Sequence, residues 1–208
     1  MRHPEETIVV INAQQETTRP LSAAKARLLE VADELFYSEG IHTVGIDRII
    51  ATAGVTKATF YKHYGSKDNL ILDYVVGRSA AVRRLLTSVV DEGQSPAEVL
   101  RWTVTTVLEN MSRPGFRGCP FLNAASEFPD RDHPVRRAIA EHREWYQDFL
   151  TDQLKLMGHP YPGDGADELY LLRDGALSCA YAGDAVAAQT AYERGAERIF
   201  TQVAAAAH

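Results

Sequence analysis

The feature that most limits the fold is a set of short apolar stripes between residues 22 and 82, each closed by a glycine. The first stripe ends at Gly40 and consists of Leu28, Val31, Ala32, Leu35 and Phe36. The second ends at Gly54 and consists of Ile46, Ile49, Ile50 and Ala53. Apolar residues three and four positions apart predict amphipathic helices, and a glycine after the last one is typical of a helix C-terminus. The second helix is therefore expected to be short, about two to three turns.

A third short helix follows directly and carries the signals of a helix start. Thr56 is a predicted N-cap, and Val55 and Phe60 occupy the two positions of a hydrophobic staple around it. Gly65 is expected to end this helix, and Ser66 is the predicted N-cap of a fourth. Two short helices joined by a tight turn at Gly54 are typical of a helix-turn-helix, here expected at residues 45–64.

The distribution of charge along the chain supports a DNA-binding helix-turn-helix. The chain has 22 Lys and Arg against 28 Asp and Glu, a net charge of −6, which argues against a protein covered in DNA-binding charge. Residues 41–67 nevertheless hold four basic residues and one acidic residue, a local charge of +3. Residues 83–208 hold 13 basic and 18 acidic residues, a charge of −5. Positive charge is thus concentrated at the expected motif.

The third helix divides into a core side and an outer side. Phe60 and Tyr64, four residues apart, are expected to face the core. The outer side chains suit DNA, because lysine and tyrosine donate to phosphate oxygens and threonine can bond a base edge or contact a thymine methyl. They are Lys57, Thr59, Tyr61, Lys62 and His63. The alternative is that they form only the solvated surface of a small bundle.

The run from residue 40 to residue 70, GIHTVGIDRIIATAGVTKATFYKHYGSKDNL, resembles the DNA-binding segment of the TetR family of bacterial transcriptional regulators. The resemblance covers residues 22–82 and implies that the five outer residues of the third helix face DNA. It also implies a phosphate contact for Lys67, and Thr43 and Arg48 are further candidates. Gly45 departs from a good helix start, because glycine inside a helix costs about 1 kcal/mol relative to alanine.

The rest of the chain is expected to be helical as well, so the fold class is all-α. Residues 1–21 are predicted to be a disordered arm, residues 22–82 the DNA-binding domain, and residues 83–208 a larger helical ligand-binding and dimerisation domain. Ser95, Pro96 and Glu98 form a capping box with proline at the first helical position. Further helices are expected at 121–127, 135–156, 166–182 and 185–204.

The family resemblance implies a homodimer built from the last two helices. Independently, these helices are rich in small residues, which allow close approach between helices. The candidate interface residues are Gly175, Cys179, Ala187, Ala191, Gly195 and Ile199.

The resemblance also implies a pocket for a small molecule within the middle helices. Aromatic residues with polar neighbours are the candidate lining, and a largely apolar effector is expected from them. They are Trp102, Met111, Phe121, Asn123, His142, Trp145, Tyr146, Phe149 and Tyr170. The alternative is that these side chains are ordinary core, with His142 a buried core histidine rather than a metal ligand. A redox role for Cys119 is a further alternative, although only Arg117 nearby would favour its thiolate.

Several classes of protein are disfavoured. The longest apolar run has five residues, Val203 to Ala207, far below the roughly 20 that span a bilayer, and no long apolar segment suggests a secretory signal. The two cysteines are too few for a disulfide framework and have no metal-ligand spacing. We therefore expect a cytoplasmic protein without metal, cofactor or membrane partner.

The leading hypothesis is a ligand-responsive repressor that binds a palindromic double-stranded DNA operator as a homodimer and is released by a small molecule. An activator and an effector-independent regulator remain alternatives. A small-molecule-binding enzyme or carrier is another, although the chain has no nucleophile elbow, phosphate loop or dinucleotide fingerprint. The sequence names neither the operator, the effector nor the regulated genes.

Overall fold

A computed structural model describes residues 22–205, and within them every regular element is an α-helix. The expected all-α class is confirmed. The expected disordered arm, residues 1–21, lies outside the described residues. The helices are α1 (Ala23–Glu39), α2 (Ile46–Ala53), α3 (Lys57–His63), α4 (Lys67–Asp91), α5 (Pro96–Met111), α6 (Pro120–Glu127), α7 (Pro134–Leu156), α8 (Pro162–Ala182) and α9 (Ala185–Ala205).

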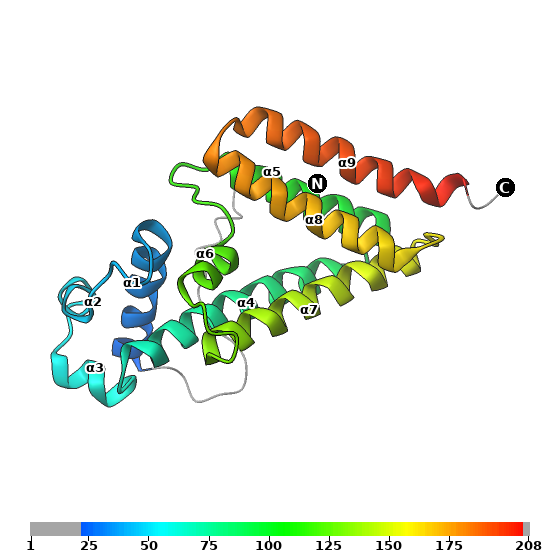
Figure 1. Cartoon of the computed structure of the whole chain (residues 1–208). Helices are drawn as coiled ribbons and strands as arrows, with labels where there is room; N and C mark the ends of the chain where they lie inside the picture. Colours follow the sequence, from blue (N-terminus) through cyan, green and yellow to red (C-terminus); the bar gives the residue numbers. More distant parts are fainter. Residues whose placement is uncertain (1–21, 206–208) are drawn as a thin grey trace.

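Helices α1 to α3 form a small unit at one end of the molecule, which we call the head (Figure 1). Its core is a set of side chains with no exposed surface, contributed by all three helices and by the start of α4. They are Leu28, Ala32, Ile49, Phe60 and Leu70. The apolar stripes read from the sequence are thus the faces that bury against one another.

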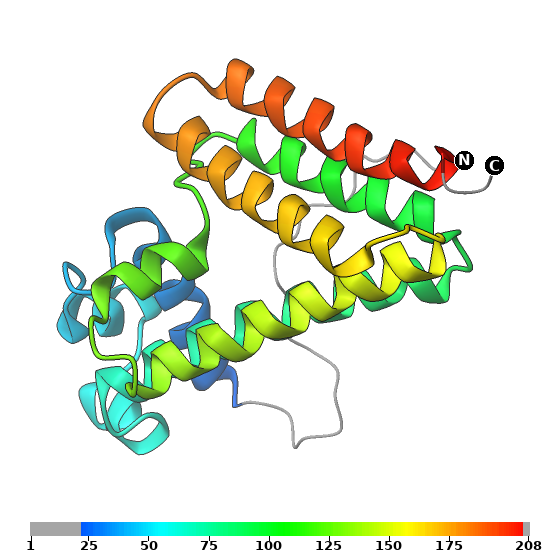
Figure 2. The same ribbon diagram turned by 45° about the vertical axis from the view of Figure 1, so that its right-hand side comes forward.

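Helix α4 joins the head to the body, which we define as α5 to α9. It runs without interruption from Lys67 to Asp91 and packs beside α7 along its length (Figure 2). The expected boundary between residues 82 and 83 therefore falls inside a continuous helix. Gly77, within α4, does not interrupt it.

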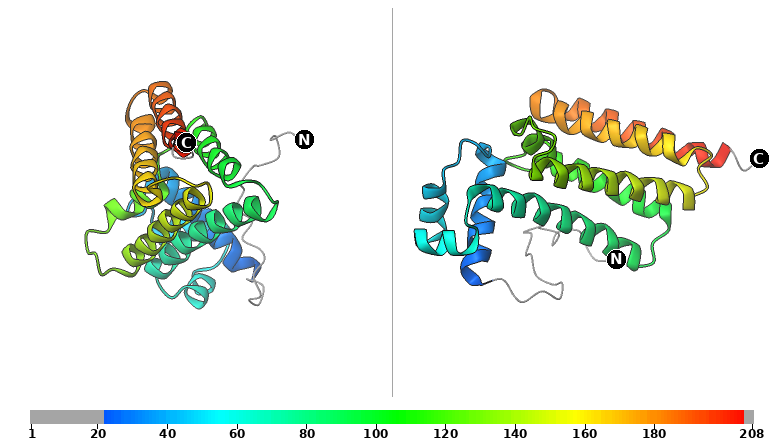
Figure 3. Two further views of the ribbon diagram at one scale, coloured as in Figure 1. Left: turned by 90° about the vertical axis from the view of Figure 1, so that its right-hand side faces the viewer. Right: turned by 60° about the horizontal axis from the view of Figure 1, so that its bottom comes forward.

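The body is a helical bundle whose outer layer is α8 and α9. These two helices pack side by side, α8 also contacts α7, and α5 contacts both α7 and α9. Figure 3 shows α8 and α9 extending away from the head, with the turn that joins them at the end nearer the head. Helix α8 begins at Pro162, four residues before the expected start at residue 166, because proline at the first helical position lacks an N–H that would need a partner.

Local capping signals explain where the helices begin. The Thr56 hydroxyl accepts the Thr59 N–H, and Ser95 and Glu98 form the expected capping box. Gly54 adopts the left-handed conformation, φ 62°, which lets the chain turn sharply between α2 and α3. Gly45 is the N-cap of α2 with extended backbone, so the expected penalty for glycine inside a helix does not apply.

Among residues 22–205, no helix is long and apolar enough to cross a membrane.

Candidate DNA-binding face and effector site

Helix α3 presents the expected outer side chains on the surface of the head. Tyr61 is 46% exposed, and Lys57 and Lys62 are exposed as well. Beneath them Phe60 is completely buried, with its ring edge-on to Tyr61 at 5.3 Å between centroids. The helix is therefore anchored by one apolar side chain while its neighbours remain available to a partner.

Two of the outer residues also make contacts that fix the position of α3. The Thr59 hydroxyl lies 2.9 Å from the Thr56 hydroxyl at the helix start. The Nε2 atom of His63, which is half-buried, lies 3.1 Å from the hydroxyl of Ser22, the N-cap of α1. His63 thus ties the end of α3 to the first residue of the head.

Two basic residues of the head, Arg48 and Lys57, form ion pairs with acidic residues of the head. Arg48 forms a bidentate ion pair with Glu39. Its Nη2 donates to Glu39 Oε1 at 2.7 Å. The Lys57 ammonium lies 3.2 Å from Asp47, and both side chains are largely exposed. Exposed pairs of this kind contribute little, at most about 1 kcal/mol, so a phosphate can compete for either cation. Thr43 is exposed in the turn before α2.

Lys67 has a structural role in addition to its expected phosphate contact. Its ammonium donates to the Ile41 carbonyl at 2.6 Å and lies over the Phe36 ring. Burial lowers the pKa of Lys67. This lysine therefore stabilises the turn between α1 and α2, and its phosphate contact stays a prediction.

A contact between body and head that sequence analysis missed is made by Glu127 at the end of α6. Its carboxylate accepts the backbone N–H groups of Ile41 at 2.8 Å and His42 at 2.7 Å, and its backbone carbonyl accepts from the His42 Nε2 at 2.8 Å. Hydrogen bonds to a charged acceptor are worth about 1.5–3 kcal/mol each. The pairing spans 86 residues of sequence, so no local pattern signals it.

A second contact between body and head, made by Arg117, lies beside the first at the edge of a small cavity. Arg117 donates its backbone N–H to the Tyr37 hydroxyl at 2.9 Å and its guanidinium to the Ser38 carbonyl. The cavity has a volume of about 160 Å³ and is lined in part by Tyr37, Arg117 and Asn123. Asn123 therefore belongs to the junction of head and body and not to the aromatic cluster described next.

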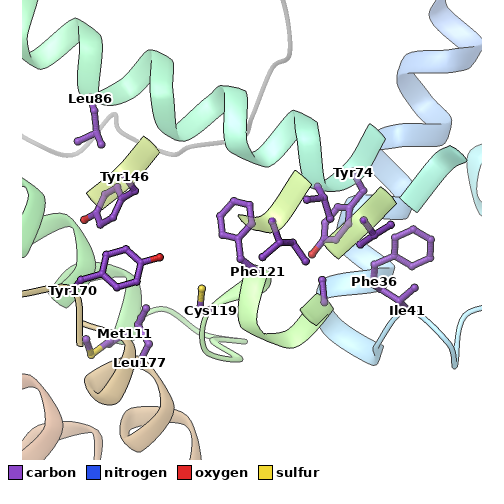
Figure 4. Packing of buried hydrophobic residues seen from close by; sticks show 14 of the residues in the cluster. Phe36, Ile41, Tyr74, Leu86, Met111, Cys119, Phe121, Tyr146, Tyr170 and Leu177 are labelled. Carbon is purple, nitrogen blue, oxygen red and sulfur yellow. The ribbon is translucent and has the colours of Figure 1, made fainter. Parts of the chain in front are cut away.

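Most of the expected pocket residues meet in one aromatic cluster in the body. The Phe121 ring stacks on the His142 ring with 3.7 Å between centroids, and Tyr146 contacts Tyr170 at 5.6 Å. Trp145 links His142 to Phe149. Met111 belongs to the same buried core as Tyr170, and both are labelled in Figure 4. Trp102, on α5, is half-buried against the core and has no ring contact with the cluster among the described residues.

Two arginines and an aspartate, which sequence analysis did not select, lie against this cluster. Asp174 accepts from Arg143 and from Arg173, each at 2.8 Å. The Arg143 guanidinium lies 4.6 Å from the Tyr170 ring centroid, and that of Arg173 lies 5.1 Å from the Tyr146 centroid. The body thus holds charged groups where the aromatic pattern predicted a largely apolar surrounding.

His142 is a buried histidine held neutral. Its Nδ1 atom lies 3.0 Å from the Ser79 hydroxyl, and burial together with nearby cations lowers its pKa to about 3. The cations are Arg173, Arg83 and Arg143. Among residues 22–205 no group of three or more His, Cys, Asp or Glu is placed to hold a metal ion.

Lowering the pH is expected to destabilise the protein through His142. The unfolded imidazole binds a proton near pH 6.5, whereas the folded one stays neutral down to about pH 3. Between these values the unfolded state binds more protons, so the stability present above pH 6.5 is lost as the pH falls. At pH 5 the loss is about 2 kcal/mol. Chemical unfolding at pH 7 and pH 5 measures it, and His142→Phe, if it showed the full wild-type pH dependence, would contradict this origin.

The outer layer of the body carries a groove between α8 and α9. Its volume is about 620 Å³, and its lining includes Gly175, Cys179 and Ala191 beside Leu171, which is 70% exposed. Ala187 is also exposed on α9. Five of the six expected interface residues thus lie on or beside this groove, and their role in a dimer stays a prediction.

The sixth residue, Ile199, is removed from the set of candidate interface residues. It is 1% exposed and belongs to the core of its own chain, so it has no surface to offer a partner. Gly195 lines the groove but is buried, and a Cβ atom there would lie 2.7 Å from Leu172 Cδ1. A larger residue at this position would therefore require the Leu172 side chain on α8 to shift.

Comparison with known proteins agrees with this geometry. Residues 28–74 match the family model described as bacterial regulatory proteins, tetR family, and residues 96–156 match the tetracyclin repressor-like C-terminal domain. The chain is 39% identical to SCO4454, a TetR-family transcriptional regulator from Streptomyces coelicolor, with a TM-score of 0.82 over 87% of this chain and 96% of that one. It is 24% identical to the HTH-type transcriptional regulator YxaF of Bacillus subtilis over 70% of this chain and 76% of that one.

Proposed function

The chain belongs to the TetR family of bacterial transcriptional regulators, and from this premise we propose that it is a repressor that a small molecule releases from a palindromic operator. As a member of this family it is a helix-turn-helix regulator and not an enzyme. The observation that carries the proposal is α3, a short helix anchored by buried Phe60 that exposes Lys57, Tyr61 and Lys62. Such a helix fits the major groove of B-form DNA.

The proposed contacts follow from the position of each side chain. Lys57 and Lys62 pair with phosphates, and the Tyr61 hydroxyl donates to a phosphate oxygen. Thr59, at the start of α3, is the proposed base contact, because the N-terminal residues of a recognition helix contact bases. Arg48, Thr43, His63 and Lys67 orient the head on the backbone.

Removing either exposed side chain is expected to weaken operator binding without unfolding the head. Tyr61→Ala and Lys62→Ala should each lower affinity at least about tenfold, and Lys62→Ala should reduce the slope of log affinity against log salt by about one. Gel shifts with DNA flanking the protein's own gene, at several salt concentrations, measure both effects.

The chain offers matched controls for this experiment. Tyr161, at the N-cap of α8, is 68% exposed, and Lys155 is exposed in the last turn of α7. Tyr161→Ala and Lys155→Ala should bind the operator like the wild type. Equal affinity of Tyr61→Ala, Lys62→Ala and the two controls would overturn the assignment of α3 as the recognition helix.

The groove between α8 and α9 supports a homodimer. Small residues there allow close approach of helices, and Leu171 exposes 70% of its apolar side chain beside them. Two-fold symmetry of such a dimer matches a palindromic operator, with one head on each half-site.

Introducing charge into the groove is expected to separate the subunits. Leu171→Lys should convert a dimer of twice the 23.0 kDa chain mass into a monomer, because burying a charged ammonium in place of an apolar side chain disfavours the interface. Light scattering coupled to gel filtration measures the mass. Leu156→Lys is the control, since Leu156 is 71% exposed at the end of α7 and outside the groove. A dimer that survives Leu171→Lys as well as Leu156→Lys would place the interface elsewhere.

Helix α6 supports a route from effector to DNA. Its first turn carries Phe121, which stacks on His142 in the body, and its last residue is Glu127, which holds the backbone of Ile41 and His42 in the head. A molecule that displaces Phe121 therefore moves the residue that positions the head. The ligand shifts the equilibrium by binding this moved state more tightly than the DNA-bound one.

The same DNA-binding head can serve a repressor or an activator. Deleting the gene and measuring transcription of its neighbours decides between them. Raised transcription supports repression, whereas lowered transcription supports activation.

A further inference from the structure

The body contains two arginines, Arg173 mostly buried and Arg143 a third exposed, that share a single carboxylate. Together with two tyrosines they form what we call the Arg–Tyr cluster, which we define as Arg143, Tyr146, Tyr170, Arg173 and Asp174. Asp174 accepts one hydrogen bond from each arginine, and within residues 22–205 it is the one carboxylate in ion-pair distance of either guanidinium. The side chains of Arg173 and Asp174 are 16% and 13% exposed. Two cations therefore share one anion, with Arg173 and Asp174 largely shielded from water and Arg143 a third exposed.

An unpaired donor marks where the missing anion belongs. The Nε atom of Arg173 is buried and has no hydrogen-bond partner, although a buried donor without a partner costs about 1–3 kcal/mol, more for a charged group. Buried charges are ordinarily paired. Stacking on Tyr146 satisfies the face of the guanidinium but not this N–H, which lies in the guanidinium plane.

The surroundings of the Arg–Tyr cluster also suit a flat organic body. Tyr146 contacts Tyr170 and, through His142, the ring of Phe121. In Figure 4 the Tyr170 hydroxyl points toward the side on which Cys119 and Phe121 lie. Phe121 already demonstrates that an aromatic ring stacks on His142 here, at 3.7 Å.

We propose that the effector is a small organic acid, whose carboxylate pairs with Arg173 and whose flat body takes the place of the Phe121 ring on His142. This inference rests on the proposed regulation by a small molecule and replaces the largely apolar effector expected from the aromatic residues alone. A carboxylate balances the second guanidinium and accepts from Arg173 Nε, and charge-assisted hydrogen bonds of this kind are the strong ones.

Matched acids and amides test the proposal with defined probes. The probes are benzoate, 2-naphthoate and biphenyl-4-carboxylate, each with its neutral carboxamide of the same shape. Titration calorimetry with the full chain is expected to show binding of at least one acid, with its amide at least about tenfold weaker, the equivalent of about 1.4 kcal/mol. Amides that bind as tightly as their acids, or an absence of binding by all three acids, would overturn the proposal.

Arg173→Gln is the informative variant, because it leaves Asp174 paired with Arg143 and so does not strand a charge. It should lose the preference for acid over amide. Arg101→Gln is the control, since Arg101 pairs with Glu197 on the exposed surface at 3.2 Å and should keep the preference. If Arg173→Gln retains the full preference of the wild type, Arg173 is not the carboxylate partner and the proposal fails.

Gel shifts with the same probes separate this proposal from the proposed regulation. Release of DNA by an acid and not by its amide supports both. An acid that binds through Arg173 and leaves the DNA complex intact supports the site but contradicts release by this ligand class. Release by the amides alone overturns the carboxylate and leaves the ligand-responsive regulator standing.

Discussion

Replacing Phe60 by alanine is expected to unfold the head and abolish operator binding. Phe60 is completely buried, and it anchors α3, a helix of seven residues that is too short to be stable without packing. Truncating a buried phenylalanine costs about 3–5 kcal/mol, which for a chain of this size lowers the melting temperature by roughly 6–20 °C. Thermal unfolding followed by circular dichroism measures the shift.

The neighbouring residue provides the control for Phe60→Ala. Tyr61 is 46% exposed, so Tyr61→Ala should change the free energy of unfolding by no more than about 0.5–1 kcal/mol while also losing operator binding. Hydrogen exchange should show lost protection in α1 to α3 for Phe60→Ala only. A Phe60→Ala protein that keeps its melting temperature would mean that α3 is held by contacts other than this side chain.

Replacing Asp174 by alanine is expected to be nearly as damaging. Arg143 and Arg173 would then lose their shared carboxylate, and breaking a buried ion pair on one side costs about 3–5 kcal/mol. Because a third of the Arg143 side chain is exposed, we expect the lower end, about 3 kcal/mol. Urea unfolding of the full chain measures the loss.

Two further variants test whether the loss of stability in Asp174→Ala comes from the unpaired arginines. Glu197→Ala breaks the exposed pair with Arg101 and should cost less than about 1 kcal/mol. Adding Arg173→Met to Asp174→Ala should recover part of the stability, because it removes the buried charge that the single variant strands. A double variant less stable than Asp174→Ala would show that Arg173 stabilises the body through packing on Tyr146 instead.

Local patterns predicted the head well, because its structure depends on neighbours in sequence. The hydroxyl of Thr56, the glycine at Gly54 and the buried ring of Phe60 each act within a few residues, so their types and spacing were sufficient. The same holds for the capping box that begins α5. Gly45 was misjudged because it was taken to lie inside the helix, whereas α2 begins at Ile46, the first residue of the apolar stripe, and Gly45 is its N-cap.

The body and its link to the head depend on contacts that no local pattern contains. Glu127 meets Ile41 across 86 residues, and Arg143 meets Asp174 across 31. The spacing of the aromatic residues predicted an aromatic cluster in the body. It did not indicate that charged side chains pack against that cluster. Ile199 was selected with its small neighbours, although its stripe faces inward.

Because α4 is one uninterrupted helix, a small tilt of α4 in the body produces a larger displacement of the head. With 25 residues, α4 is about 37 Å long. A tilt of about 5° in a rod of that length displaces its far end by about 3 Å, roughly the length of one hydrogen bond. Under the proposed function, a displacement of that size would break the contacts of α3 to bases and phosphates, so a small effector bound in the body would be sufficient to release DNA.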